Sequence, residues 1–475
     1  MKFGRAPTTK QTRGIPPMVP ATTGGISSER DGQIDVGVEM PIGIVWRTHW
    51  GTLVTLAVAG YASAWSWSVP LQALGNVVFW LCTCLVGLGL LWRSCRSQVA
   101  RKWLLGALAF AGVLALTALW SIAVTDTLKQ AVQFGATLVI AAAVGAELES
   151  DAFARDRLVR VLAWLAPAAL AMTASFVAIG LVVPSLVAGP GTSGPFNGPN
   201  VLSIFLALTL PFTLVHPRVA RRRLLLFALL AATALAGSLS GGRTGLGALM
   251  VAVYALAVGR RRIDLLATGL AACALAVGVT SASSWKPRGL GEPVVVTREQ
   301  MDLVITRYIA VAKGEPMPNP SALNRAVGGR TEAWAEAVRL LDERPAQGHG
   351  FGTGGTVFDR YESHERFTFF VGAFASRTNP HNAYLQAPLE LGIAGGLVFL
   401  IPVLGSLLLA LRYLVRGTAD ASTVAFSATV VAAAAAASFE STLTQFGPLT
   451  LLSWIAISAV AAIWMRRRGY AARRD

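Results

Sequence analysis

The chain has 475 residues, of which 54% are apolar and 14% are charged, whereas soluble globular domains carry about 25% charged residues. Several stretches of roughly 17–25 residues hold almost no charge, and each is long enough to cross a bilayer core of about 30 Å. The composition excludes a soluble globular protein and predicts an all-α polytopic membrane protein.

The net charge is +16, with 41 Lys and Arg residues against 25 Asp and Glu residues. The basic residues fall in short clusters between apolar stretches, at 93–102, 216–223, 259–262 and 466–475. A nucleic-acid-binding protein gathers its cations on one face, whereas short basic loops at alternate span ends mark the cytoplasmic side of a membrane protein. The pattern therefore indicates a lipid bilayer and not nucleic acid as the partner.

Residues 1–45 are polar and rich in Pro, Thr and Gly, without the apolar core of a secretory signal. They are expected to form a disordered cytoplasmic tail. About twelve transmembrane helices follow, predicted at 48–67, 70–92, 103–123, 128–147, 158–183, 200–215, 224–239, 244–258, 264–281, 385–411, 421–438 and 448–465.

Most of the basic residues lie on one side if both termini are cytoplasmic. This orientation divides the chain into spans one to nine (46–281), an extracytoplasmic loop domain (282–382), spans ten to twelve (383–465) and a basic cytoplasmic tail (466–475). The loop domain is a large helical periplasmic loop between spans nine and ten. Its basic residues are nearly balanced by acidic ones, as expected for a long external segment that escapes the charge rule.

Three of the four cysteines, Cys82, Cys84 and Cys273, fall inside apolar spans, and Cys95 falls in a basic loop. None lies in the large loop, so no external disulfide framework is implied. Cys82 and Cys84 have no partner pair, and they are interpreted as packing residues and not as metal ligands.

The large loop contains signals for the start and end of helices. Helices are expected at 298–314 and 331–343, the second ended by Pro345. The glycine-rich segment GHGFGTGG (348–355) lacks the G-K-[ST] ending of a nucleotide-binding loop. Two readings of it stay open, a flexible hinge and a wall of a ligand cavity, and His349 within it is expected to be a turn residue.

One histidine stands directly before an apolar span, in NPHNAYL (379–385). Asn379 is expected to N-cap the helix, with Pro380 at its first position and His381 in its first turn. The positive potential there favours a neutral imidazole that can accept a proton. The alternative is a capping or interfacial histidine at the membrane boundary.

Two arginines stand at predicted helix starts on the same outer face, Arg243 in SGGR and Arg330 before TEAW. Arginine at a helix start is poorly placed against the helix dipole, so a carboxylate or a bound phosphate is expected to compensate Arg330. Arg243 can also simply extend to the lipid headgroups. Two arginines and a histidine at one membrane face suit a pyrophosphate-bearing lipid, because guanidinium groups bind phosphate oxygens in pairs.

These residues belong to four segments that together carry a family resemblance. The segments are GPFNGPNVLSIFLALTLP (194–211), LSGGRTGLGAL (239–249), GGRTEAWAEAVRLLDERPAQGHGFGTGG (328–355) and NPHNAYLQAPLELGIAGGLVF (379–399). In their order and spacing, the chain resembles the O-antigen ligase and O-antigen polymerase superfamily of bacterial surface-polysaccharide membrane glycosyltransferases. The family often has serine directly before the first arginine, where this chain has Gly242.

The resemblance implies a metal-independent inverting glycosyltransferase without cofactor or nucleotide, in the bacterial inner membrane. Its expected donor is a polyprenyl-diphosphate-linked glycan, and its expected acceptor is a glycan or a lipid core. By the same resemblance, Arg243 and Arg330 would hold the diphosphate and His381 would be the base. Arg377 is a further candidate for the diphosphate. Glu390 is expected to pack or orient its helix.

Three functions stay open. The first is a ligase or a polymerase of exopolysaccharide or lipopolysaccharide, with polymerisation slightly favoured. The second is a transporter or flippase of lipid-linked glycans, which would need polar residues near the midplane of the membrane. The third is a non-catalytic partner of other polysaccharide-assembly proteins, which would not require Arg243, Arg330 and His381 together.

Overall fold

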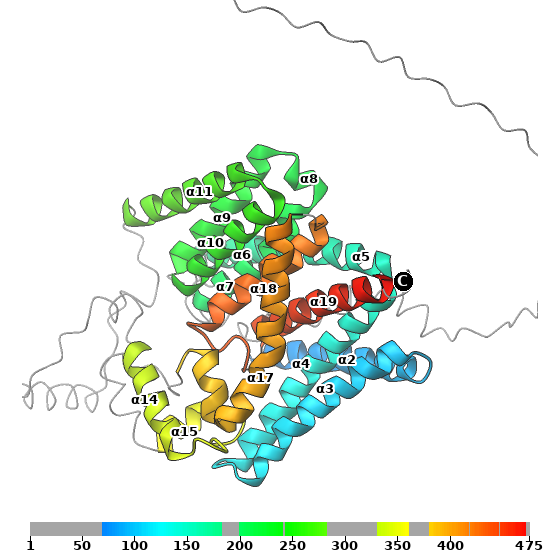
Figure 1. Ribbon diagram of the computed structural model, residues 1–475. Coiled ribbons are helices and arrows are strands. Elements are labelled where there is room, and N and C mark those ends of the chain that lie inside the picture. Colours follow the sequence, from blue (N-terminus) through cyan, green and yellow to red (C-terminus); the bar gives the residue numbers. More distant parts are fainter. Residues whose placement is uncertain are drawn as a thin grey trace, which may run out of the picture.

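A computed structural model describes residues 69–182, 199–240, 243–282, 330–360, 380–417, 419–445 and 447–471. Every regular element within these ranges is a helix (Figure 1). The helices are α2 (Val69–Ser94), α3 (Gln98–Leu116), η1 (Thr117–Leu119), α4 (Val124–Ser150), α5 (Ala152–Leu162), α6 (Leu165–Val182), α7 (Pro199–Val215), α8 (Pro217–Ala220), α9 (Arg223–Ser240), α10 (Arg243–Arg260), α11 (Ile263–Ala282), α14 (Arg330–Glu343), α15 (Gly354–Arg360), α17 (Ala383–Arg416), α18 (Ala421–Ala437) and α19 (Pro448–Ala471).

The apolar helices support the prediction of a multi-pass membrane protein. Six of the helical segments are long and apolar enough to cross a bilayer, at Asn76–Ser94, Gln98–Leu119, Val124–Ser150, Phe153–Ile179, Ala383–Arg416 and Pro448–Gly469. Five of the other predicted spans coincide with shorter apolar helices, α7, α9, α10, α11 and α18. The remaining predicted span, 48–67, lies outside the described residues, as do the tail 1–45 and the helix 298–314. The count of twelve and the periplasmic loop therefore stay predictions.

Local chemistry explains where several helices begin and end. Ser97, Asp151 and Asp420 each place a side-chain oxygen on a free backbone N–H of the next helix, which caps its start. The span predicted at 158–183 contains a turn after α5, directly before Pro167 in α6. Proline lacks the N–H that a continuous helix needs, and the turn separates the two helices there.

The bundle has two distinct ends. At one end, called the loop end, α14 and α15 lie against the beginning of α17 (Figure 1). The opposite end carries Arg93, Arg155, Arg262 and Arg416 at helix termini and is called the basic end. The helices α2 and α19 approach the basic end with their C-termini, and α4 runs from the loop end to the basic end. The segregation of charge along the bundle follows the positive-inside pattern.

A cluster of aromatic rings forms the centre of one half of the bundle. Phe134 of α4 lies 5.6 Å from Trp454 of α19 and 5.8 Å from Phe399 of α17, measured between ring centroids. Phe110 of α3 joins Trp454 at 5.8 Å. Such edge-on and tilted pairs add about 0.5–1.5 kcal/mol each beyond the burial of their surface. The cluster fixes α3, α4, α17 and α19 to one another.

The other half of the bundle is held by close approach of small residues. Gly245 of α10 packs so tightly on Ser203 of α7 that an added methyl group would overlap the serine side chain. Two residues later, Gly247 on the same helix has no atom within 4 Å of the position of a Cβ. Small residues let helix backbones approach within a membrane, and here they bring the start of α10 beside the start of α7.

This contact predicts different outcomes for two matched substitutions. Gly245→Ala and Gly247→Ala both replace a helical glycine and gain the same helix propensity, about 1 kcal/mol. We expect Gly245→Ala to cost about 1–3 kcal/mol of overpacking and to lower the Tm of the detergent-solubilised protein, while Gly247→Ala maintains or raises it. Equal Tm values for the two variants would contradict this packing.

Candidate functional site

His381 lies just outside α17 and not within its first turn. Its φ of +45° places it in the left-handed region, and Asn382 is the N-cap, accepting the backbone N–H groups of Tyr384 and Leu385. The expected start of the helix at Asn379 and Pro380 is therefore wrong, because the Asn382 side chain caps the helix three residues further on. The strained backbone turns the imidazole away from the helix axis and toward a neighbouring loop.

The imidazole of His381 contacts a carboxylate that follows α18. Its Nδ1 lies 3.1 Å from Glu440 Oε2, and the His381 and Glu440 side chains are 39% and 16% exposed. The other oxygen, Glu440 Oε1, accepts the side-chain amide of Asn200 at 2.7 Å. A carboxylate in its ionised form only accepts hydrogen bonds, so Nδ1 is the donor to an ionised Glu440.

Asn200 lies in the first turn of α7 and not at its N-cap position. The helix α7 begins one residue earlier, at Pro199, because proline suits the first position of a helix. Asn200 thereby lies in the first turn, where its amide is directed at Glu440. The start of α7 and His381 are thus joined through a single carboxylate.

The start of α14 is tied to the residue before His381. The indole Nε1 of Trp334 donates to the carbonyl oxygen of Pro380 at 2.9 Å, and its ring lies 6.0 Å from that of Phe439, beside Glu440. Arg330 is the first residue of α14, one helical turn before Trp334. The tertiary structure therefore brings the helix position of Arg330 to the neighbourhood of His381.

The start of α10 reaches the same neighbourhood by another route. Arg243 is the first residue of α10, two residues before Gly245, which packs on Ser203. Ser203 in turn bonds the carbonyl of Asn200 at 3.1 Å. The helix position of Arg243 is thus adjacent to the first turn of α7. Arg377, the further candidate for the diphosphate, lies outside the described residues.

These contacts place the N-termini of three helices, α7, α10 and α14, near His381, at a place called the convergence. The first turns of α7 and α10 contain no acidic residue, so the positive ends of their dipoles are not offset from within the helix. Free N–H groups and aligned dipoles at helix starts favour a bound anion. Arg339 of α14 donates hydrogen bonds to Glu336 and Glu343, and these carboxylates raise the pKa of its guanidinium. Arg339 is therefore paired within its own helix and is not part of the convergence.

The glycine-rich segment is not a free hinge, because it is fastened to α17. The backbone N–H groups of Gly352 and Gly354 donate to the two carboxylate oxygens of Glu390, at 2.8 and 3.0 Å. Gln386 adds a third bond at 2.7 Å. Glu390 is fully buried, and both of its carboxylate oxygens accept hydrogen bonds from the loop. These bonds give Glu390 the orienting role that was expected for it.

The same segment closes the loop end of the bundle. Gly392 interrupts α17 with a φ of +73°, and the N–H of Ile393 beyond it donates to the carbonyl of Pro345 at 2.8 Å. Phe351 is fully buried and lies 5.3 Å from Phe134 in the aromatic cluster. The loop therefore fills the end of the bundle with the Phe351 ring. It also links α14 to α17, the helix that His381 precedes.

His349 is a buried part of this plug. Its Nε2 lies 2.9 Å from the carbonyl oxygen of Leu340, its backbone N–H donates to Leu389, and its backbone carbonyl accepts from Ile122. The imidazole links α14 to the loop and does not face the convergence at His381. The structure thus places it in a packed turn, where the sequence had placed a turn residue.

Glu440 is the site residue that the sequence analysis missed. It stands at the end of the alanine run VVAAAAAASFE (430–440), where it is the only carboxylate between Ala421 and Arg474. A single acidic residue at the outer end of an apolar span was a usable signal, because an ionisable group at a membrane boundary is a candidate for function. Its pairing with His381 depends on tertiary structure.

No group of three His, Cys, Asp or Glu side chains close enough to hold a metal ion occurs among the described residues. The described groups at the convergence are an imidazole, a carboxylate and an amide beside helix N-termini. This set suits proton transfer beside a bound anion.

Part of the chain matches a known family. Residues 224–400 match the model of a family described as O-antigen ligase. The match includes the starts of α10 and α14, the glycine-rich segment, His381 and Glu390. It ends before α18, so Glu440 lies beyond it, and Asn200 lies before it. No curated protein matched the chain.

The Glu390 bonds predict the effect of an isosteric change. Glu390→Gln replaces one acceptor oxygen with an NH₂ group that faces a backbone N–H, leaving a buried donor unsatisfied at a cost of about 1–3 kcal/mol. We expect faster proteolysis within 344–360 and a lower Tm. Glu343→Gln, at the more exposed end of α14, is the matched control and is expected to change neither. Unaltered cleavage of Glu390→Gln would show that these bonds do not hold the loop.

Proposed function

We propose that this chain, whose residues 224–400 match the family described as O-antigen ligase, transfers or polymerises glycan from a polyprenyl-diphosphate-linked donor. The acceptor is a hydroxyl group of a glycan or of a lipid core. The reaction takes place at the loop end of the bundle, which we assign to the outer face of the bacterial inner membrane. Both termini are then cytoplasmic.

A single observation carries this proposal: His381 contacts Glu440, which also accepts a hydrogen bond from Asn200, near the starts of α7, α10 and α14. A transferase of this kind needs a proton acceptor beside a binding place for two phosphates. The imidazole supplies the acceptor, and the helix starts with Arg243 and Arg330 supply the positive potential. A flippase would instead need its polar groups near the midplane.

His381 acts as the general base in this mechanism. Its Nδ1–H donates to Glu440, which orients the ring and stabilises the imidazolium that forms. The acceptor hydroxyl passes its proton to Nε2 as its oxygen attacks the anomeric carbon of the donor. A new glycosidic C–O bond forms on the face opposite the leaving group, so the anomeric configuration inverts.

The leaving group is the polyprenyl diphosphate. The bond between the anomeric carbon and the diphosphate oxygen breaks as the new bond forms, and negative charge accumulates on that oxygen. Arg243 and Arg330 hold the diphosphate and stabilise this charge, which lowers the barrier if they contact it more strongly in the transition state. Arg377 is the third candidate for this contact. The reaction requires no metal or nucleotide.

We expect His381→Ala to lower glycan transfer by about 10²–10⁴-fold, the usual contribution of a general base. The assay is transfer from a lipid-diphosphate donor in proteoliposomes. Glu440→Gln leaves the ring in place but removes the negative charge, so it should lower the turnover number more than it changes KM. Activity of His381→Ala near that of the wild type would remove the proposed base.

Substitution of the arginines tests whether they bind the diphosphate of the donor. Arg243→Ala and Arg330→Ala are each expected to weaken donor binding and to lower turnover by at least about tenfold, because charge-assisted bonds to phosphate contribute about 1.5–3 kcal/mol. Arg339→Ala, on the same helix as Arg330 but paired with Glu336 and Glu343, is the control and should bind donor normally. Unchanged binding and turnover in both site variants would contradict the diphosphate role.

The polysaccharide profile of a deletion strain decides between the two forms of the reaction. Single repeat units accumulating on lipid would identify a polymerase. Long chains that lack their final attachment would identify a ligase.

A further inference from the structure

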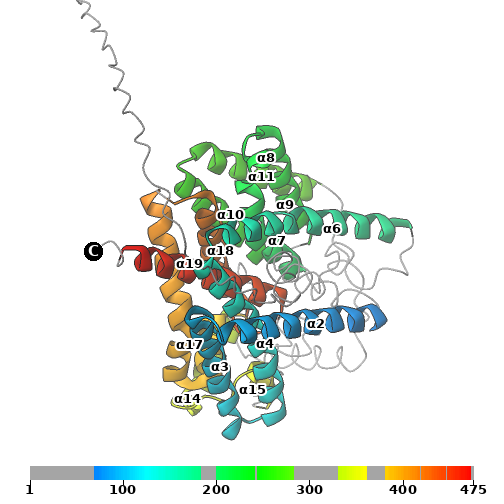
Figure 2. The same ribbon diagram turned by 90° about the vertical axis from the view of Figure 1, so that its right-hand side faces the viewer.

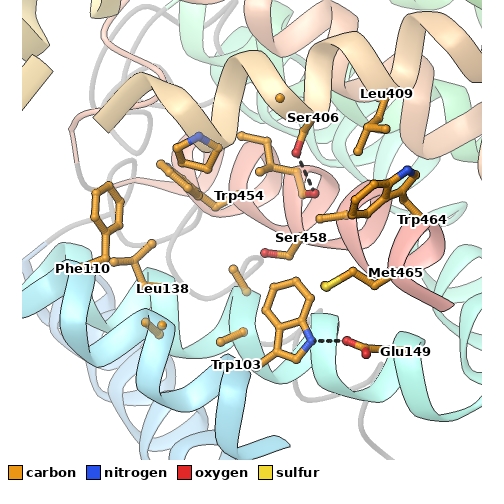
Figure 3. Close-up of a pocket in the computed structure, with 18 of the residues that line it drawn as sticks. Trp103, Phe110, Leu138, Glu149, Ser406, Leu409, Trp454, Ser458, Trp464 and Met465 are labelled. Atoms are coloured by element: carbon orange, nitrogen blue, oxygen red, sulfur yellow. Dashed lines mark hydrogen bonds between the residues drawn. The ribbon is translucent and has the colours of Figure 1, made fainter. Parts of the chain in front are cut away.

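A cavity lies away from His381, toward the basic end of the bundle. It is a groove of about 830 Å³ between α3, α4, α17 and α19, within the range of small-molecule and lipid sites. Figure 3 shows Trp103, Leu138, Leu409 and Trp464 lining it. Most of its lining side chains are apolar, so its preferred occupant is apolar as well.

The groove is closed toward the loop end and charged toward the basic end. Phe110 and Trp454 of the aromatic cluster bound it on the inside, which separates it from the glycine-rich loop. Lys102 and Arg412 stand at its mouth, at the basic end of α3 and α17. Both residues are exposed.

The ion pairs at this end of the described chain use other residues. Arg93 pairs with Glu147 and Arg155 with Asp420, and none of the ion pairs found there includes Lys102 or Arg412. One carboxylate, Glu149, also lines the mouth, but its Oε2 accepts the indole N–H of Trp103 at 2.8 Å (Figure 3). Two cations against one engaged carboxylate leave the mouth attractive to an anion.

We propose that this groove is a binding site for an anionic glycerophospholipid of the surrounding membrane. One acyl chain fills the apolar groove, and the phosphate lies between Lys102 and Arg412. Basic pockets between transmembrane helices on the cytoplasmic side are suited to anionic headgroups. The position of the cations fixes the headgroup at the basic end, so a lipid whose diphosphate lies at the loop end does not fit this site.

Two glycines of the groove allow it to be filled without disturbing the bundle. Gly106 of α3 and Gly405 of α17 both line it, and a Cβ at either position meets no atom within 4 Å. Gly112, on the same helix as Gly106, is equally open but lies outside the groove. Gly106→Leu therefore blocks the groove, and Gly112→Leu is its matched control.

The test is native mass spectrometry of the full chain in mixed micelles titrated with phosphatidylglycerol or phosphatidylcholine. We expect one tightly held phosphatidylglycerol per chain and weak retention of phosphatidylcholine. Removing both cations in Lys102→Ala/Arg412→Ala should weaken phosphatidylglycerol binding about thirtyfold, from about 1 kcal/mol for each charge. Arg218→Ala/Arg416→Ala removes two exposed cations at the same end but outside the groove. This variant should change the affinity for phosphatidylglycerol by no more than about twofold.

Gly106→Leu should abolish the tight site while Gly112→Leu keeps it, which makes the outcome independent of the charge variants. Equal loss in the Gly106 and Gly112 variants, or equal binding of the two phospholipids, would overturn the proposal. Displacement of the phospholipid by polyprenyl phosphate would assign the groove to an isoprenoid chain instead. If the wild type is a dimer in the mass spectrum and Gly106→Leu is a monomer, the groove is instead an interface with a second copy of the chain. Glycan transfer is measured in parallel, so that failure here is distinguishable from failure of the proposed reaction.

Discussion

The buried carboxylate of Glu390 is the constraint on which the loop end depends. A charge inside a membrane bundle is costly unless hydrogen bonds compensate it, and here two backbone N–H groups of the glycine-rich segment and one amide do so. The same three bonds fasten the loop to α17, directly before the kink at Gly392. The loop lies between α14 and Phe351, so these bonds help to position α14, together with the bonds of Trp334 and His349.

A second carboxylate organises the candidate site, and the two differ in exposure. Glu390 is fully enclosed by its donors, whereas Glu440 keeps part of its surface open and shares its oxygens between His381 and Asn200. The enclosed carboxylate suits a structural role, and the open one suits a group that adjusts charge during a reaction. This division explains why His381, with Glu440 behind it, is a better candidate base than His349, which is buried in the plug.

The two ends of the bundle differ in chemistry, with α14 at one end and α8 at the other (Figures 1 and 2). The starts of α7, α10 and α14, His381 and Glu440 lie at the loop end, and cationic helix termini lie at the basic end. The aromatic cluster of Phe110, Phe134, Phe399 and Trp454 lies between the glycine-rich loop and the groove. Such a partition permits a polar reaction on one side of the membrane while lipid occupies the other.

The sequence by itself determined the helical membrane class, because uncharged stretches of span length have few other solutions. It also predicted the helix over 331–343 and singled out His381, Arg243 and Arg330 by their places before helices. It misplaced the start of α17 by three residues, since two asparagines, Asn379 and Asn382, both qualify as caps and only packing selects between them. Only the tertiary structure decided that Glu440 meets His381, that Asn200 faces Glu440 and that the glycine-rich loop binds Glu390. Each of these pairs joins residues 36 to 240 positions apart, and no local periodicity encodes a contact over that separation.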